Sequence, residues 1–127
     1  MFWPTPGTIV FVWIFGAFKH KGIVSNRWEN GKPMVLASAY DTAGVAEISW
    51  DAFTGGKPCY IEGYPSKLPA ILVLYNARCR LGQPYNVLAS NCEHFVYVCH
   101  GQPAKSPQAA AVLALGLFGL IAAASRS

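Results

Sequence analysis

The segment NCEHF at residues 91–95 places a cysteine directly behind a residue that favours the start of a helix. Asn91 suits the N-cap position, so Cys92 is expected at the first position of a helix. There the unpaired backbone N–H groups of the first turn and the positive end of the helix dipole both favour a thiolate over a thiol. Cys92 is therefore the first candidate for a nucleophile.

A thiol nucleophile needs a proton acceptor, and the chain has three histidines. His94 follows Cys92 by two residues, a rotation of about 200° on a helix, so its ring points away from the sulfur. His100 lies about two helical turns, roughly 12 Å, further along, which is too far for direct proton transfer. His20 opens a predicted strand and can approach Cys92 in the folded chain. The sequence therefore favours His20 as the base.

Other interpretations of the cysteines compete with catalysis. On spacing alone, a lone cysteine on an apolar helix is more often an inert core residue than a nucleophile. A metal site built from Cys92, His94, Cys99 and His100 matches none of the common zinc spacings, so we expect no metal and no cofactor. The four cysteines also lack the dense spacing of a disulfide scaffold. We expect reduced thiols, with Cys99 buried as a small apolar residue.

The cysteine motif also resembles a known family. LGQPYNVL at residues 81–88, leading into NCEHFV at residues 91–96, is similar to the nucleophile region of lecithin retinol acyltransferase-like proteins, a permuted branch of the NlpC-type papain-like superfamily. In the same order, the segments that resemble its other strands are residues 6–8, 20–24, 35–38 and 44–53. The resemblance covers roughly residues 5–100, and its cysteine motif, with Asn91, Glu93 and His94 around Cys92, is the specific part.

The resemblance implies that Cys92 is the nucleophile and His20 its general base. Family members usually carry a second polar residue on the next strand, and the matching position here is close to Ala37. Alanine cannot orient an imidazole. Ser38 or Asp41 can substitute as the orienting residue, the chain can work as a cysteine–histidine dyad, or it has lost activity.

The sequence predicts one α+β domain. By resemblance it is a permuted papain-like fold, with an antiparallel sheet packed against the nucleophile helix. We expect this domain over residues 1–101, a linker over 102–108 and a hydrophobic helix over 109–124. The expected elements are strands at 8–15, 20–25, 34–40 and 59–64, a hairpin connection at 26–33, a strand and short helix within 47–53, a helix from 68 or 69 to about 80 capped by Ser66, and the nucleophile helix from 92 to about 100.

The composition indicates a membrane or partner contact, because 53% of the residues are hydrophobic and only 13% are charged. Sixteen helical residues, 109–124, span about 24 Å, short of a hydrocarbon core of about 30 Å. With uncharged flanks the apolar run reaches twenty residues, 106–125. We expect residues 106–127 to contact a membrane. A helix packed on the domain or between protomers is the alternative.

The predicted reaction is acyl transfer through a thioester on Cys92, by an acyltransferase or hydrolase, with the backbone N–H of Cys92 stabilising the oxyanion. The apolar tail, the net charge of +4 and exposed aromatics such as Trp3 and Trp28 favour a lipid ester or amide as substrate. The alternatives are a cysteine peptidase or amidase acting on cell-wall peptides, and a non-catalytic membrane-associated scaffold. Residues 8–15 lack the features of a signal peptide, so we expect a membrane-associated, otherwise cytoplasmic protein that binds no nucleic acid.

Overall fold

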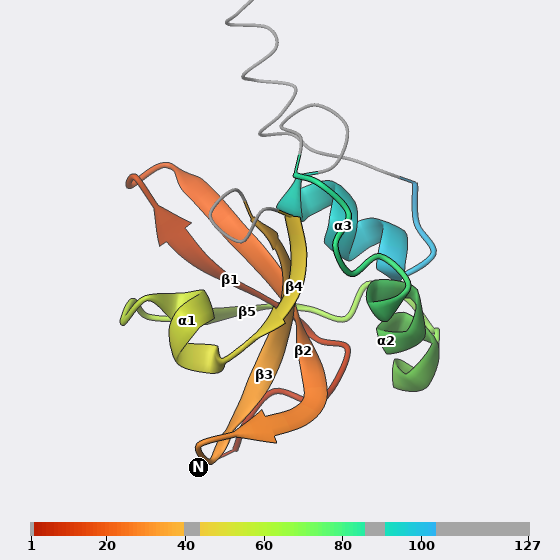
Figure 1. Ribbon diagram of the computed structural model, residues 1–127, viewed down its shortest axis with the longest axis horizontal. Helices are drawn as coiled ribbons and strands as arrows, with labels where there is room; N and C mark the ends of the chain where they lie inside the picture. Colours follow the sequence, from red (N-terminus) through yellow and green to blue (C-terminus); the bar gives the residue numbers. More distant parts are fainter. Residues whose placement is uncertain (1, 40–43, 86–90, 104–127) are drawn as a thin grey trace, which may run out of the picture.

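The computed structural model describes residues 2–39, 44–85 and 91–103 of the 127 residues. This part of the chain forms a five-stranded antiparallel sheet in the order β4-β3-β2-β1-β5, with helices on both of its sides (Figure 1). The α+β prediction is therefore confirmed. The elements are β1 (Ile9–Ile14), β2 (Phe18–Glu29), β3 (Lys32–Ala39), β4 (Gly44–Ile48), α1 (Trp50–Thr54), β5 (Tyr60–Gly63), α2 (Ala70–Arg78) and α3 (Cys92–Cys99).

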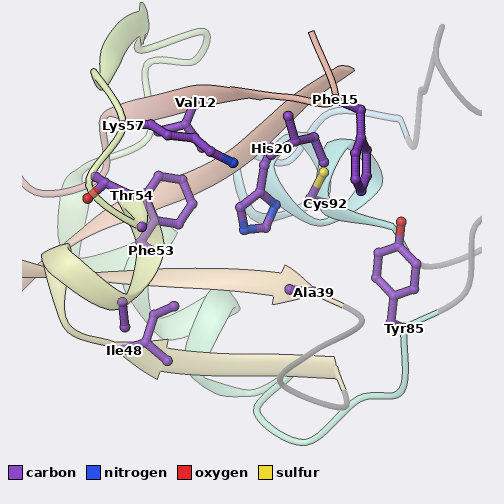
Figure 2. Close-up of a pocket in the computed structure, with 13 residues that line it drawn as sticks. Val12, Phe15, His20, Ala39, Ile48, Phe53, Thr54, Lys57, Tyr85 and Cys92 are labelled. Atoms are coloured by element: carbon purple, nitrogen blue, oxygen red, sulfur yellow. The ribbon is translucent and has the colours of Figure 1, made fainter. Parts of the chain in front are cut away.

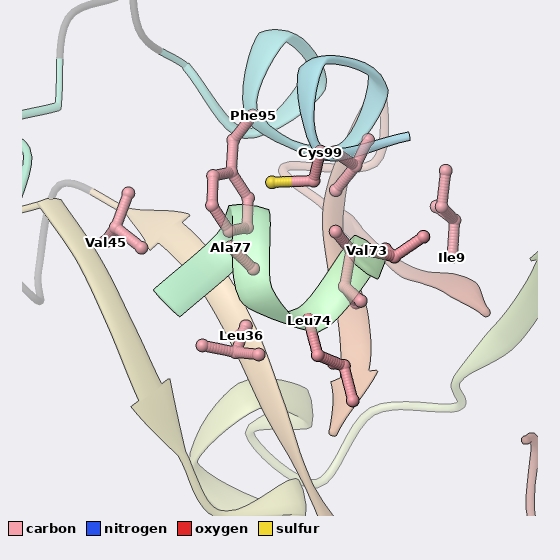
Figure 3. Packing of buried hydrophobic residues seen from close by; sticks show 10 residues of the cluster. Ile9, Leu36, Val45, Val73, Leu74, Ala77, Phe95 and Cys99 are labelled. Atoms are coloured by element: carbon pink, nitrogen blue, oxygen red, sulfur yellow. The ribbon is translucent and has the colours of Figure 1, made fainter. Parts of the chain in front are cut away.

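The two faces of the sheet carry separate apolar clusters, because successive side chains of a strand point to opposite faces. On one face, Ile9, Ile23 and Leu36 pack against α2 and α3. Figure 3 shows Phe95 and Cys99 of α3 meeting side chains of α2 over this face. On the other face, the strand residues of the second cluster pack with Phe53 of α1. The long strand β2 therefore has α3 on one side and α1 on the other.

The four strands predicted at residues 8–15, 20–25, 34–40 and 59–64 form. The strand expected within residues 47–53 lies earlier, at Gly44–Ile48, and the length of one connection also differs from the prediction. The expected hairpin connection at residues 26–33 is wrong, because β2 continues to Glu29 and β3 begins at Lys32. Only Asn30 and Gly31 form the turn, with φ of 55° and 75°. Two left-handed residues are typical of the tight turn that an Asn-Gly pair favours, and this turn fits the right-handed twist of the flanking strands.

The helices also form where the sequence predicts them. Gly55 ends α1 in the left-handed conformation, at φ 59°. The expected cap of α2 is wrong: Pro69 occupies the N-cap position, with no side-chain cap bond. Ser66 instead accepts the backbone N–H of Leu68 at 3.3 Å and bonds to Nδ1 of His100 at 2.7 Å. Its hydroxyl therefore joins the start of α2 to the end of α3.

The C-terminal predictions fall beyond the described residues. The proposed linker at 102–108 is described only to residue 103, and the hydrophobic segment at 109–124 not at all. Within the described ranges, no helix is long and apolar enough to cross a membrane.

Gly22 on β2 has no space for a side chain, since an added Cβ would lie 2.5 Å from Val35 Cγ1 and 2.8 Å from Phe53 Cε1. We expect Gly22→Ala to lower the free energy of unfolding by about 1–3 kcal/mol, because the added methyl overpacks the face below α1. Urea denaturation measures this change. Ala17→Ser, in an exposed turn, is the control, and its free energy of unfolding should stay within about 0.5 kcal/mol of that of the parent. Equal losses of stability in both variants would contradict the close packing at Gly22.

Candidate active site

The start of α3 follows the sequence prediction closely. Asn91 has extended backbone angles, and its side-chain oxygen accepts the N–H groups of Glu93 at 2.9 Å and His94 at 3.0 Å. Cys92 is the first residue of the helix, and its own N–H faces its sulfur. The cap therefore uses the next two N–H groups and leaves that of Cys92 directed at the thiol.

The sulfur of Cys92 lies against the backbone of β2. Its thiol donates to the carbonyl oxygen of Lys19 at 3.7 Å. The backbone N–H of Lys21 also acts on this sulfur by a hydrogen bond that favours the thiolate. Cys92 thus contacts the strand at the residues that directly precede and follow His20.

Cys92 and His20 open onto the same cavity, of about 580 Å³ (Figure 2). It lies between the β1–β2 hairpin, α1 and the start of α3, and its lining is mainly apolar. Its lining residues are Val12, Ile14, Phe15, His20, Ala39, Ile48, Ala52, Phe53, Thr54, Gly55, Lys57, Tyr85 and Cys92. The fold therefore brings the two residues singled out from the sequence into one apolar cavity.

The ring of His20 is positioned by packing from α1. His20 pairs with Val12 across β1 and β2, and its ring stacks on Phe53, with centroids 4.9 Å apart and an angle of 30° between the planes. Stacking restricts the rotation of the imidazole plane. Phe53, which the sequence analysis did not assign to the site, is therefore a positioning residue for His20.

The expectation of a readily ionised thiol is wrong. Burial raises the pKa of the Cys92 thiol, and the charge of Glu93 adds to this effect. The N–H of Lys21, the Lys21 ammonium and the N–H of Cys92 act in the opposite direction and do not compensate. Desolvation outweighs the helix-start effect because Cys92 is only 8% exposed. The resting sulfur is therefore a thiol, and its proton has to be removed for it to react.

A buried charged cluster fixes the start of α3 on the sheet. The Lys21 ammonium lies 2.7 Å from a Glu62 carboxylate oxygen and 3.3 Å from one of Glu93, and it donates to the Tyr97 hydroxyl at 3.0 Å. Burial alone would lower the pKa of Lys21, but the hydrogen bonds to Glu62 and Tyr97 and the charge of Glu62 raise it overall. Lys21 therefore stays charged and ties β5 and α3 to β2.

Of the two sequence candidates for an orienting residue, the described part of the chain includes only Ser38. Ser38 is buried on β3 between Ala37 and Ala39, and strand alternation directs it to the sheet face opposite the cavity. Ala39 lines the cavity, so the position on β3 that faces it is again alanine. Asp41 lies outside the described residues.

The other two histidines are separate from Cys92, as expected. His94 has a buried Nδ1, and no hydrogen-bond partner for it occurs in the described part of the chain. His100 follows α3, where its Nε2 donates to the Gly7 carbonyl at 2.8 Å. Burial lowers the pKa of His100, which is consistent with a neutral structural residue.

The prediction that Cys99 is a buried core residue is confirmed. All four cysteines are free thiols. Cys99 is fully buried in the cluster below α3, and burial raises its pKa to about 12. It is therefore an inert core residue and no second nucleophile.

Sequence reasoning assigned no role to Tyr85, which lines the cavity. Figure 2 shows its hydroxyl directed toward the side where Phe15 and Cys92 lie. Burial raises the pKa of Tyr85, and the charge of an ionised Cys92 raises it further. Tyr85 therefore keeps its hydroxyl proton at neutral pH and shares the cavity with Cys92. Its place within the segment LGQPYNVL was the only signal in the sequence.

The fold and the cavity together define an α+β protein in which a helix-start cysteine and a strand histidine face one apolar cavity. The family model described as lecithin retinol acyltransferase matches residues 17–104, which is more than half of the chain. The chain belongs to this family, and the resemblance seen in its motifs is confirmed. The family suggests an acyltransferase-type activity in lipid metabolism, and its members are typically acyltransferases or hydrolases. A search of curated proteins found no match to this chain.

The buried cluster around Lys21 generates a stability prediction. The side chains of Lys21 and Glu93 are only 5% and 4% exposed, so Lys21→Met should lower the free energy of unfolding by about 3 kcal/mol by leaving the buried Glu93 carboxylate without its cation. Lys32→Met is the matched control, because Lys32 pairs with Asp51 at 2.8 Å on the surface and should cost less than about 1 kcal/mol. Urea denaturation compares them. Similar losses of stability in the two variants would show that the buried cluster contributes no more to stability than an exposed ion pair.

Proposed function

We propose that this protein is a thiol acyltransferase or hydrolase that acts on a lipid ester or amide through a thioester on Cys92, with His20 as general base. The observation that carries this proposal is that Cys92 and His20, far apart in the chain, line one cavity whose other walls are mainly apolar. Membership of the lecithin retinol acyltransferase family supports the reaction class.

The proposed first half-reaction begins when His20 takes the proton of the Cys92 thiol as the sulfur attacks the substrate carbonyl carbon. A carbon–sulfur bond forms, and the carbonyl oxygen becomes an oxyanion. When the tetrahedral intermediate collapses, the bond to the alcohol or amine breaks, and the His20 imidazolium returns its proton to the leaving group. The product is a thioester on Cys92.

The second half-reaction releases the acyl group. A water molecule, or the hydroxyl or amino group of an acceptor, gives a proton to His20 and attacks the thioester carbonyl. The carbon–sulfur bond then breaks, and the proton returns to the Cys92 sulfur. Water as the attacking group makes the protein a hydrolase, and another acceptor makes it an acyltransferase.

Two groups are suited to stabilise the oxyanion. The backbone N–H of Cys92 points toward the reacting sulfur, and it belongs to the positive end of α3. The Tyr85 hydroxyl lines the same cavity and is held protonated. We propose these as the donors to the oxyanion.

The lining of the cavity favours a lipid over a cell-wall peptide. Its walls include Val12, Ile14, Phe15 and Ile48 and contain no carboxylate among the described residues. Apolar walls of this kind suit an acyl chain, whereas a peptide backbone would leave its polar groups without partners. A non-catalytic scaffold remains the competing hypothesis, because alanines stand at positions 37 and 39 of β3.

Two finer assignments belong to the same proposal. We infer a permuted papain-like fold of the NlpC type from the order of the histidine strand before the cysteine helix. We also propose that residues 106–127 anchor the protein at a membrane, on the basis of their apolar composition. Activity on vesicle substrates that survives removal of residues 106–127 unchanged would contradict the anchor.

The nucleophile and base are tested with a water-soluble acylating probe that labels thiols. In a chain whose exposed Cys79 is replaced by serine, Cys92→Ala should abolish labelling. His20→Ala should slow labelling at pH 7 by about 100-fold, the scale of a lost general base. Because burial raises the pKa of the Cys92 thiol, the His20→Ala variant should recover as the pH rises toward and above the usual thiol range, where the free thiolate forms without help. Mass spectrometry of the labelled protein measures the extent and the rate of labelling in each variant.

Cys99→Ala is the matched control and should leave labelling unchanged, since Cys99 is buried on the opposite face of the sheet from the cavity. Labelling that persists without Cys92, or that fails in the folded parent protein, would favour the scaffold hypothesis.

Tyr85→Phe tests the proposed oxyanion donor. Removing one such donor should lower kcat by about 100-fold with little change in KM, because the hydrogen bond forms only as the oxyanion develops. Steady-state hydrolysis of a short-chain ester gives both constants. Tyr75→Phe on the exposed side of α2 is the control and should behave as the parent. A change confined to KM in Tyr85→Phe would instead assign Tyr85 to substrate binding.

A further inference from the structure

The tip of the β1–β2 hairpin is apolar on both of its faces. Trp13 and Phe18 stand on opposite faces, since Trp13 pairs with Lys19 and Phe18 pairs with Ile14. Phe15, in the turn between the strands, is 91% exposed, and Trp13 is 45% exposed. A hairpin with one buried face would alternate apolar and polar residues, so this tip carries more apolar surface than the core of the domain uses.

The conformation of the turn adds a second observation. Phe15 has a φ of 52°, in the left-handed region, and Gly16 follows with a φ of 70°. A bulky residue in this region is strained, whereas glycine or asparagine would largely avoid the strain. An exposed aromatic side chain held in a strained turn contributes little to folding, which points to a role in binding.

The same tip forms part of the cavity that holds Cys92. Ile14 and Phe15 line this cavity, and Figure 2 shows Phe15 on the Cys92 side of it. Whatever contacts the hairpin tip therefore lies next to the proposed reaction site.

Cations and further aromatics surround the tip. The Lys19 ammonium lies 4.6 Å from the ring centroid of Phe11 and 5.3 Å from that of Trp13. Phe11 stacks on Tyr60 of β5, which is half exposed. Lys57 lines the cavity, and the whole chain carries a net charge of +4. Aromatic rings beside lysines match the interface of an anionic bilayer, where rings sit at headgroup depth and ammonium groups meet phosphates.

We propose that the hairpin-tip surface, defined as Phe11, Trp13, Phe15, Phe18, Lys19 and Tyr60, docks on an anionic lipid bilayer and turns the Cys92 cavity toward it. Phe15 and Trp13 enter the boundary between headgroups and acyl chains, and Lys19 contacts the phosphates. An acyl chain can then reach the cavity without crossing water. This inference rests on the proposed function for its lipid substrate, but the docking itself is measured separately.

Two other exposed aromatic or apolar regions compete with this surface. Trp3, expected from the sequence at an interface together with Trp28, packs edge-to-face on Trp28 and Trp50. Trp28 lies near the end of β2 that is remote from Phe18, about 30 Å along the strand. Helix α2 exposes Ile71 and Tyr75 at 76% and 64%. Neither region borders the cavity, so both supply controls.

The test uses the full chain with Trp3, Trp28 and Trp50 replaced by phenylalanine, which leaves Trp13 as the single tryptophan. The protein is mixed with phosphatidylcholine vesicles that contain or lack phosphatidylserine, some with brominated acyl chains. We expect Trp13 emission to shift to shorter wavelength and to be quenched by the brominated chains, more strongly in the anionic vesicles. A second variant, with Trp13 also replaced by phenylalanine and with Tyr75→Trp, reports on α2 and should not be quenched.

Vesicle-bound protein with unquenched Trp13, quenching of the α2 probe instead, or no vesicle binding at all would each overturn the docking surface. In the otherwise native chain, Trp13→Ser should reduce activity on vesicle substrates by about tenfold, the effect of losing roughly 1.4 kcal/mol of membrane contact. Trp13→Ser should leave labelling of Cys92 by the soluble probe unchanged. Tyr75→Ser on α2 is the control and should also leave this labelling unchanged. If the soluble probe labels Cys92 normally but the brominated chains do not quench Trp13, the docking surface is rejected and the proposed function is not. If the brominated chains quench Trp13 but the probe does not label Cys92, the proposed function is rejected and the docking surface is not.

Discussion

The contact between the start of α3 and the backbone of β2 is the constraint on which the proposed chemistry depends. The Cys92 sulfur donates to the Lys19 carbonyl, and the Lys21 ammonium pairs with Glu93, the residue next to Cys92. Because His20 lies between the two lysines, one short strand segment determines where both the sulfur and the imidazole stand. A shift of α3 along this strand would change the position of the Cys92 sulfur relative to the His20 ring, and the buried ion pair of Lys21 with Glu93 opposes such a shift.

Burial of the sulfur has two opposing consequences. An apolar cavity suits an acyl chain and excludes water from the thioester, but it also raises the pKa of the Cys92 thiol. In the proposed mechanism a nearby base is therefore more important than in an exposed thiol site, because that mechanism removes the proton during the attack. The stack of His20 on Phe53 gives that base a defined ring plane where β3 presents alanine.

The two ends of the long strand β2 differ in what their aromatic residues do. At the Glu29 end, Trp3 packs on Trp28 and on Trp50, and these contacts hold the N-terminal segment against β2 and α1. At the Phe18 end, the aromatics project from the hairpin beside the cavity. Trp28 is 54% exposed and Trp13 is 45% exposed, so exposure does not separate the two ends. They differ because only the hairpin end borders the cavity.

Much of the local structure was predictable from the sequence. Asn91 before Cys92, the Asn30-Gly31 turn, the apolar run of β1 and the glycine after α1 act through nearby backbone angles and hydrogen bonds, so the sequence alone determined the helix with Cys92 at its start and the main strands. Helix geometry, which excluded His94 and His100, also singled out His20 together with Cys92, and both residues line the cavity. Only the tertiary structure decided the raised pKa of Cys92, the direction of Ser38 away from the cavity, and the parts played by Lys21, Phe53 and Tyr85. These depend on strand pairing and on the depth of burial, which are set by contacts between residues distant in the chain.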